Sequence, residues 1–148
     1  MGLHHAAGQS DDLVVEIHGN VREAKCMSCG WRGPMQDTLD RVRAGEDDPP
    51  CLRCGGILKS ATISFGQPLV PTVINRAFRA ASEADLLLAI GTSLQVYPIA
   101  AVVPEAKHRG ARVVIINAES TQFDEVADAV LNDPIGRVLP EICGTSQL

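Results

Sequence analysis

Aromatic residues are scarce in this sequence, at 3% of 148 residues, so Val, Ile, Leu and Ala must build its core. Basic residues are also few: 13 Lys and Arg stand against 18 Asp and Glu, a net charge of −5. This balance argues against a nucleic-acid partner, which is bound through clustered basic residues. No apolar run approaches the ~20 residues of a membrane span, and no signal-peptide pattern opens the chain. We therefore expect a cytoplasmic protein that binds neither nucleic acid nor membrane.

Four of the five cysteines form two C-x-x-C pairs, Cys26 with Cys29 and Cys51 with Cys54. Each pair turns two thiolates toward one point, so the two pairs predict a closed, structural zinc site. A glycine follows each pair and can adopt the positive φ of such a turn. Two disulfides are disfavoured in a cytoplasmic chain, a redox dithiol needs only one pair, and iron remains the alternative metal. The fifth cysteine, Cys143, stands apart and is expected to be a half-buried thiol.

The first half of the sequence is polar and rich in turn residues. A β-branched run over residues 13–17 predicts a strand, and residues 35–42 predict a short helix between the cysteine pairs. The stretch 44–50, AGEDDPP, predicts a loop. We assign residues 20–60 to a zinc-binding module.

The second half alternates apolar strands with amphipathic helices. Strands are predicted over residues 63–65, 85–90, 112–116 and 129–131. Helices are predicted after Pro71, with apolar positions from Val73 to Ala81 on one face, and over 99–108 and 135–142. The run 85–90, DLLLAI, is apolar throughout, as expected for a strand covered on both faces. This order predicts an α/β fold, a Rossmann-like parallel sheet over residues 61–142, within one domain that spans residues 1–148.

Small and polar residues follow three of the predicted strands. These are His18, the run Gly91, Thr92 and Ser93, and the run Asn117, Ala118 and Glu119. Each alone is explained by a turn or a helix cap. Because ligands of parallel sheets bind beyond the carboxyl ends of the strands, the three together favour a nucleotide site.

The ordered motifs resemble those of the sirtuins, the NAD-dependent protein lysine deacylases, most closely the bacterial members. The resemblance rests on E-I-H-G-N from Glu16, the two C-x-x-C pairs, F-G-Q from Phe65, G-T-S-L-Q-V-Y-P from Gly91, and I-N-A-E from Ile116. It covers nearly the whole chain, from Gly2 to Pro140. It implies that an acylated-lysine protein or peptide is the substrate, and that the acyl group passes to ADP-ribose with release of nicotinamide.

The resemblance also implies residue roles. His18 matches the general base that deprotonates a ribose hydroxyl of NAD, a task suited to an imidazole that is neutral near pH 7. The residues that match NAD-binding positions are Gly91, Thr92, Ser93, Asn117, Ala118, Glu119 and Ile135. The residues that match the strand pairing with the substrate peptide are Ile63, Ser64, Phe65 and Gly66.

Three features depart from the sirtuin pattern. Ser60, Ala61 and Thr62 stand where many sirtuins have a proline and an acidic or amide residue, and Gln67 replaces an acidic residue, so the preferred acyl group and peptide stay open. The glycine-rich G-A-G-x-S loop and the T-Q-N-x-D motif are absent from these 148 residues. Met1 stands about where the family has its aspartate, so we expect a chain that begins inside the family domain, lacks the first strands of the sheet and has weak or no activity alone.

Two other functions remain open. A non-catalytic, zinc-bearing remnant that only binds partners would carry the same motifs. A rubredoxin-like electron carrier would use the same four cysteines for iron, and a colourless protein would exclude it.

Overall fold

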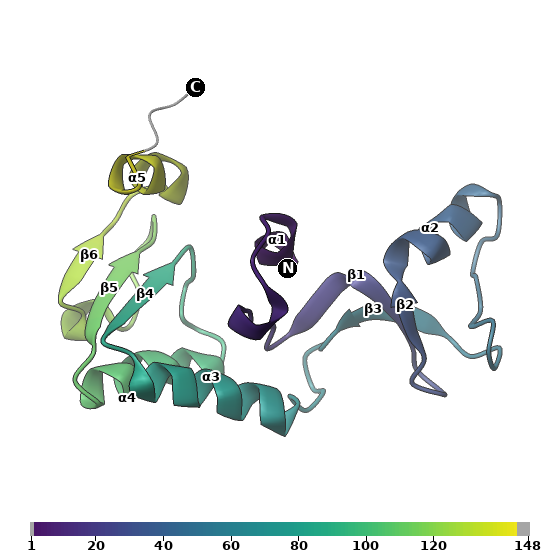
Figure 1. The fold of residues 1–148 in the computed structure, drawn as a ribbon, viewed down its shortest axis with the longest axis horizontal. Helices are drawn as coiled ribbons and strands as arrows, with labels where there is room; N and C mark the ends of the chain where they lie inside the picture. The colour runs from purple at the N-terminus through teal and green to yellow at the C-terminus, as the bar shows by residue number, and fades with distance from the viewer. Residues whose placement is uncertain (1, 145–148) are drawn as a thin grey trace. The chain divides into compact units, whose positions relative to one another are not determined.

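The computed structural model describes residues 2–144 (Figure 1). Met1, which the sequence placed at the position of the family's aspartate, lies outside the described residues. The chain divides into two compact units, one up to Val73 and one from Ile74, which are treated separately below. The elements of the first unit are α1 (Leu3–Ala6), the 3-10 turn η1 (Asp11–Leu13), β1 (Gly19–Cys26), β2 (Arg32–Pro34), α2 (Met35–Arg43) and β3 (Leu58–Thr62).

The first unit is built on a three-stranded antiparallel sheet in the order β2-β1-β3. The helix α2, predicted over 35–42, packs against β1 and β2. The strand predicted over 13–17 was wrong. Val14, Val15 and Glu16 form no strand, because no other segment of residues 2–144 pairs with them, and the first strand begins instead at Gly19.

The second unit is a parallel sheet with helices. Its elements are α3 (Pro71–Glu83), which begins at the unit boundary, β4 (Leu86–Ile90), the 3-10 turn η2 (Ile99–Ala101), α4 (Val102–His108), β5 (Arg112–Ile116), the 3-10 turn η3 (Asp124–Val126), β6 (Ala129–Leu131) and α5 (Ile135–Ile142). The strands are parallel in the order β4-β5-β6, and Leu86 pairs with Arg112 through to Ile90 with Ile116. The predicted α/β fold with a parallel sheet is confirmed.

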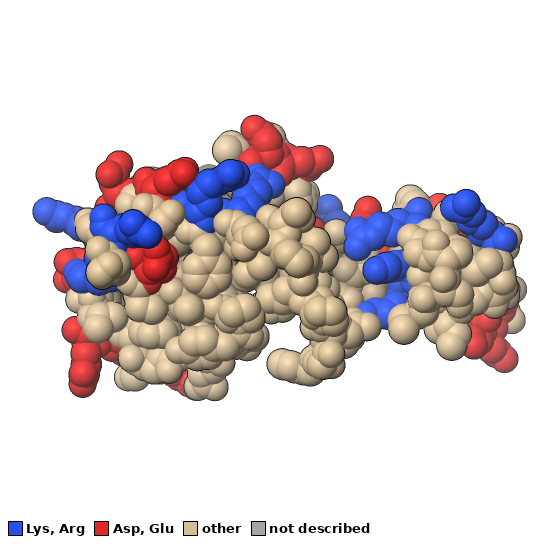
Figure 2. Space-filling model, turned by 90° about the horizontal axis from the view of Figure 1, so that it is seen from below, with Lys and Arg blue, Asp and Glu red and all other residues tan. Residues whose placement is uncertain are grey.

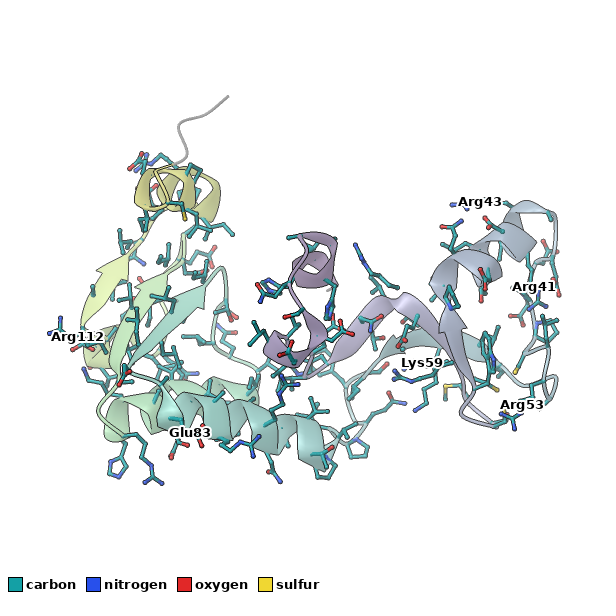
Figure 3. All side chains as sticks on the ribbon, in the orientation of Figure 1. Arg41, Arg43, Arg53, Lys59, Glu83 and Arg112 are labelled. Carbon is teal, nitrogen blue, oxygen red and sulfur yellow. The ribbon has the colours of Figure 1, made fainter. Side chains whose placement is uncertain are left out.

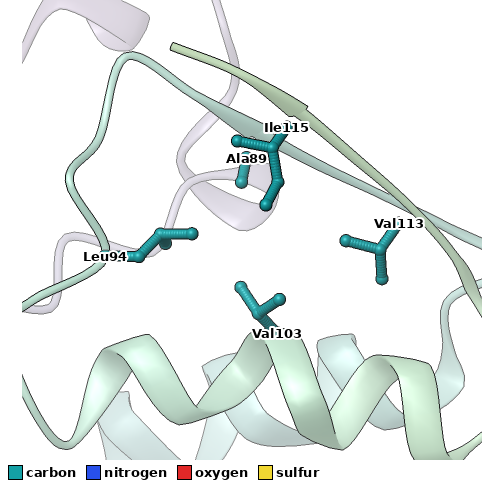
Figure 4. Close-up of a cluster of buried hydrophobic side chains, with 5 residues drawn as sticks. All are labelled: Ala89, Leu94, Val103, Val113 and Ile115. Carbon is teal, nitrogen blue, oxygen red and sulfur yellow. The ribbon is translucent and has the colours of Figure 1, made fainter. Parts of the chain in front are cut away.

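One face of this sheet forms the core of the second unit. Ala89, Val113 and Ile115 point from β4 and β5 toward Val103 of α4, and Leu94 closes the cluster (Figure 4). Val113 and Ile115 are fully buried. A smaller cluster of alanines, Ala81, Ala106 and Ala111, joins α3 and α4 to the same face. The buried residues of this core are all aliphatic, as the scarcity of aromatic residues predicted, and the partly buried Phe123 packs against them.

The other face of the sheet is open among residues 2–144. Leu86 and Leu88 are 52% and 51% exposed, and Ile90 and Leu131 are more than one-third exposed. The expectation that DLLLAI is covered on both faces was therefore wrong. The helices α3 and α4 both pack on the face of Leu87 and Ala89, and β4 is an edge strand of the described sheet.

The four predicted helices are present with small changes. The helix predicted over 99–108 starts as the 3-10 turn η2 before α4, and α5 matches its predicted bounds. The thirteen residues of α3 make a helix of under four turns. Within residues 2–144, no helix has both the length and the apolar character needed to cross a membrane. Cys143, expected to be half-buried after α5, is exposed.

Candidate functional site

The four cysteines of the two C-x-x-C pairs converge in the first unit. The sulfurs of Cys26 and Cys54 are 3.5 Å apart, those of Cys29 and Cys51 are 3.9 Å apart, and all four lie within 4.8 Å of one another. A tetrahedral zinc ion with Zn–S bonds of ~2.3 Å separates its sulfur ligands by about 3.8 Å. The observed separations fit that tetrahedron, and all four cysteines are free thiols. The predicted four-cysteine cluster is confirmed.

The two cysteine pairs form the same backbone turn. Gly30 N donates to Cys26 O at 3.1 Å, and Gly55 N donates to Cys51 O at 2.7 Å. Both glycines have a positive φ, of 71° and 72°, as the sequence predicted. The strand β1 supplies Cys26 at its last residue, and Cys51 N bonds Gly56 O at 2.8 Å just before β3. The sheet and the two turns therefore hold the ligands in place from both sides.

The thiols of Cys26 and Cys54 differ in acidity. The backbone N–H of Cys29 donates to the Cys26 sulfur and, against the effect of burial, lowers the pKa of Cys26 to about 6. The Gly56 amide lowers the pKa of Cys54, but hydrogen bonds with the sulfurs of Cys29 and Cys26 outweigh it and raise the pKa of Cys54 to about 12. A metal ion that binds the thiolates must therefore displace protons, so its affinity rises with pH.

His18 lies in a tight turn just before β1 and is half-buried. The Glu16 carboxylate spans this turn, because one oxygen accepts the Gly2 N–H at 2.9 Å and the other accepts the Asn20 side-chain amide at 2.9 Å. Gly19 N closes the turn onto Glu16 O at 3.0 Å. Glu16 and Asn20 are the first and last residues of the E-I-H-G-N motif, and the sequence alone predicted no role for either. Their i, i+4 spacing of carboxylate and amide was the available signal.

Gly19 is required by its surroundings. Its φ is +69°, and a Cβ added there would lie 2.0 Å from the carbonyl oxygen of Ala61 on β3. A side chain at this position would force the His18 turn away from β3. The close approach of the His18 turn to β3 thus requires glycine directly after His18.

The segment predicted to pair with substrate follows β3 directly. Ile63 N donates to His18 O at 2.8 Å, so the sheet brings the segment beside the histidine. The strand predicted over 63–65 was wrong, because β3 ends at Thr62 and Ser64 to Gln67 form a turn. The Gln67 side-chain oxygen accepts the Ser64 N–H at 3.0 Å and the Lys59 ammonium at 3.2 Å, which folds the segment back. Phe65 at the tip is 95% exposed.

In the second unit, three predicted segments meet at the carboxyl ends of the parallel strands. Gly91 N, directly after β4, donates to Ile116 O at the end of β5 at 2.9 Å. Asn117 N donates to Leu131 O at the end of β6 at 3.1 Å. Ile135, at the start of α5, lies over Gly91, since a Cβ added there would be 3.1 Å from Ile135 Cδ1. In Figure 1, α5 lies beyond the strand arrowheads.

The loop after β4 borders a cavity of about 320 Å³ between β4 and α4, with Thr92 and Ser93 at its edge. The Thr92 hydroxyl accepts the Leu94 N–H at 3.2 Å, and Leu94 has a positive φ of 54°. The Gln122 amide donates to Leu94 O at 2.5 Å. Gln122 thus supports this loop, and its place in a polar run gave no signal in the sequence.

The loop after β5 presents polar groups to the same edge. The Asn117 amide donates to Glu119 O at 2.8 Å, and Ala118 and Glu119 are exposed. Glycine, hydroxyl, amide and carboxylate groups therefore gather where ligands of parallel sheets bind.

Comparison with known proteins identifies the family. A model of the Sir2 family matches residues 1–98 of the chain. The chain belongs to the Sir2 family. NAD-dependent protein deacetylase 2 of Streptomyces coelicolor is 50% identical to it over 141 residues, which are 95% of this Sir2 chain and 58% of that protein. An NAD-dependent protein deacetylase of Sulfolobus acidocaldarius is 43% identical over 141 residues, 95% of this chain and 54% of the relative.

Solved Sir2 structures share the fold. A Sir2 structure with a p53 peptide and NAD+ matches with a TM-score of 0.86 at 30% identity, over 98% of this chain and 60% of that one. A Sir2 structure bound to a propionylated peptide matches with the same score and identity, over 98% and 61%. This Sir2 chain therefore spans between one-half and two-thirds of the length of these relatives, and it shares the fold of the solved structures over nearly all of its own length.

Proposed function

We propose that these residues form part of an NAD-dependent protein lysine deacylase that moves the acyl group of an acylated lysine to ADP-ribose. One observation carries the proposal: the Gly91, Asn117 and Ile135 segments, separated in sequence, converge at the carboxyl edge of one parallel sheet. The family membership supports the same activity, because its relatives are named as NAD-dependent protein deacetylases.

The strand-end groups fit the adenosine half of NAD. The absence of a side chain at Gly91 leaves the loop backbone open to close approach, and the Ser93 hydroxyl offers a hydrogen-bonding group to a ribose or phosphate. The exposed Glu119 carboxylate can accept hydrogen bonds from ribose hydroxyls. Ala118 and Ile135 supply small and apolar surface beside them. When bound, NAD would supply the ADP-ribose that accepts the acyl group and the nicotinamide that leaves.

His18 is the proposed general base. Its imidazole would accept a proton from a ribose hydroxyl at a ring nitrogen, and the Glu16–Asn20 bridge would hold its turn in position. Ile63, Ser64, Phe65 and Gly66 are the proposed substrate-binding segment, which would pair with the peptide as an added strand. The Ile63–His18 hydrogen bond supports this pairing of roles, because it links the two segments directly.

Zinc is the proposed metal of the four cysteines, with a structural role. All four tetrahedral positions are filled by protein sulfurs, so no open position is left for a substrate. Residues 20–60 would then be the zinc-binding module. Thiols kept reduced for metal binding are typical of the cytoplasm, which supports that location. A colourless protein that holds about one zinc per chain would exclude an iron-based electron carrier.

The 148 residues alone are proposed to have weak or no activity. Neither a glycine-rich phosphate loop nor an N-x-D motif occurs in them, and positioning of reactants can supply ~7–11 kcal/mol of a barrier. The alternative, a non-catalytic binding module, predicts that activity is absent even when the parts of the relatives that lie outside the match are supplied.

A chimera separates the two. Joining this chain to the part of the Streptomyces coelicolor relative that lies outside the match should give NAD-dependent nicotinamide release from an acetylated peptide. In that chimera His18→Ala should lower turnover by a factor of ~100–10,000 with a small change in NAD affinity. The exposed His108, outside every proposed segment, provides the control His108→Ala. An inactive but folded, zinc-loaded chimera would favour the binding module.

A further inference from the structure

The register of the first sheet places three cations in one row. Lys25 on β1 pairs with Arg32 on β2 on one side and with Lys59 on β3 on the other. Residues directly opposite in antiparallel strands project from the same face of the sheet. Like charges at such positions repel one another, so this row is an unfavourable arrangement for the folded chain by itself.

The charge of this row is only partly compensated. Arg32 forms an ion pair with Glu23, at 2.8 Å. The Lys59 ammonium donates to neutral acceptors, Thr62 O at 2.7 Å, Ser64 Oγ at 3.3 Å and Gln67 Oε1 at 3.2 Å. Within residues 2–144, the Lys25 side chain has no hydrogen bond or ion pair. Two positive charges therefore remain without a counter-charge.

The row lines a pocket of about 430 Å³ in the first unit. Its walls also include Glu16, whose carboxylate is already engaged by Gly2 and Asn20, and apolar side chains such as Ile17 and Val70. The first unit, at the right in Figure 2, shows more Lys and Arg than Asp and Glu on the face seen there. A cationic pocket with an apolar wall fits a carboxylate on a short aliphatic stem.

The pocket adjoins the segment that follows β3, because Ile63 and Gln67 line it as well. Lys59 on β3, labelled in Figure 3, connects the pocket to this segment, because it lines the pocket and its ammonium donates to Ser64 and Gln67. A peptide that pairs with residues 63–66 would carry its neighbouring side chains past this row.

We propose that this pocket binds an Asp or Glu side chain of the protein substrate, within a few residues of the acylated lysine, and that Lys25 and Lys59 set a preference for acidic flanking sequence. The proposal rests on the proposed function, which supplies the peptide. Charge complementarity selects the occupant, because the row offers two uncompensated cations and no free carboxylate.

Peptide binding to the zinc-loaded 148-residue chain tests the proposal. Four fluorescent peptides would be compared by anisotropy and NMR titration at fixed ionic strength: acetyl-lysine or unmodified lysine, each flanked by Asp and Glu or by Asn and Gln. The acidic acetylated peptide should bind more tightly than its amide counterpart, by about two- to fivefold for each cation engaged. Its binding should shift the amide signals of Lys25, Lys59 and Ile63.

Charge variants locate the effect. Lys25→Gln should remove about two- to fivefold of the acidic preference. Lys25→Glu should reverse it, and should raise the melting temperature because it places an anion between Arg32 and Lys59. Arg43→Gln removes an equal charge from the same unit, on α2 and away from Lys59 (Figure 3), and should leave the preference unchanged.

The outcomes separate this proposal from the proposed function. Equal binding of acidic and amide peptides, or a preference that Lys25→Glu does not alter, would overturn the pocket assignment. Loss of the distinction between acetylated and unmodified lysine, with the acidic preference intact, would count against the deacylase function and leave the pocket standing.

Discussion

The two units of this chain are held together by different means. The second unit contains both aliphatic clusters of the described structure, including the fully buried Val113 and Ile115. Among residues 2–73, the buried Ala, Ile and Cys side chains are Ile17, Ala24, Cys26, Cys51 and Ala61, and Pro49 is buried as well. Two of those five are metal-site cysteines, so the first unit has little apolar burial to offset the entropy lost on folding. A region of this kind depends on its metal, whereas the second depends on packing.

Removal of the metal should therefore have the largest effect, and only on the first unit. Structural zinc contributes about 10–16 kcal/mol in small zinc domains. Chelation, or Cys26→Ala, should unfold residues 19–62 while the second unit keeps its protected amides. Trp31 and Tyr97, the single Trp and the single Tyr, report the first and the second unit respectively. Trp31 emission should shift to that of an exposed indole.

A lower pH should weaken metal binding and so, like chelation, destabilise the first unit. The thiols must lose protons to bind, and the Cys54 pKa, raised to about 12, makes that loss unfavourable at low pH. Cys143→Ala is the matched control, because that exposed thiol lies outside the cluster. If the first-unit amides exchanged as slowly in the metal-free chain as in the metal-loaded chain, the first unit would not depend on its metal.

Packing should dominate in the second unit. Ile115→Ala removes a fully buried side chain from the cluster that faces α4 and should lower the free energy of unfolding by about 2–5 kcal/mol. Leu88→Ala, on the open face of the same sheet, should cost about 1 kcal/mol or less. Urea unfolding followed by amide exchange measures both. Equal effects would show that the open face is covered in solution.

The sequence predicted the parts of the fold that are encoded locally. The apolar strands 86–90 and 112–116, the helices α2, α3 and α5, and the cysteine cluster follow from periodicity and spacing alone. The open face of β4 could not be predicted, because composition shows that a strand is apolar and cannot show what covers it.

The errors lie where partners come from elsewhere in the chain. Residues 13–17 have the β-branched composition of a strand but no pairing strand in the described part of the chain, whereas the polar run from Gly19 pairs on both sides. The turn at 64–67 depends on the Gln67 side chain and on Lys59, a contact that strand propensity does not include. Two of the three predicted strand-end segments, at Gly91 and Asn117, did converge, because parallel strands place their carboxyl ends together. The third was wrong, because His18 follows no strand and stands instead just before β1 of the antiparallel sheet.

Gly19→Ala tests a single backbone contact between β1 and β3 in the first unit. The added Cβ would combine left-handed strain with a 2.0 Å approach to Ala61 O, and should destabilise the loaded first unit by about 2–3 kcal/mol. Gly8→Ala has a similar φ of +87° with open space around it, so it isolates the strain, about 1–2 kcal/mol. Thermal melting monitored through Trp31 compares the two. If both variants lowered the melting temperature equally, β3 would have moved away at Ala61 with no loss of stability.

The smallest predicted effect is electrostatic and belongs to the second unit. Asp128 lies just before β6, and its carboxylate accepts hydrogen bonds from the Lys107 ammonium and the Val113 N–H, both at 2.7 Å. The hydrogen bond from Lys107 has the largest effect and the Val113 amide the second largest, and together they lower the pKa of Asp128 below its usual value.

A carboxyl with a depressed folded-state pKa stabilises the fold above its unfolded pKa of ~3.9 and loses that contribution as pH falls through the folded value. Asp128→Asn should therefore lower the urea midpoint of the second unit at pH 7, and the difference from the wild type should shrink steadily below pH 4. Asp124→Asn is a poor control because the Asp124 carboxylate accepts a hydrogen bond from Thr121, so the exposed Asp85, directly before β4, provides Asp85→Asn instead. The urea midpoints of Asp128→Asn and the wild type could instead differ as much at pH 3 as at pH 7. That result would show that Asp128 acts through hydrogen-bond geometry and not through its charge.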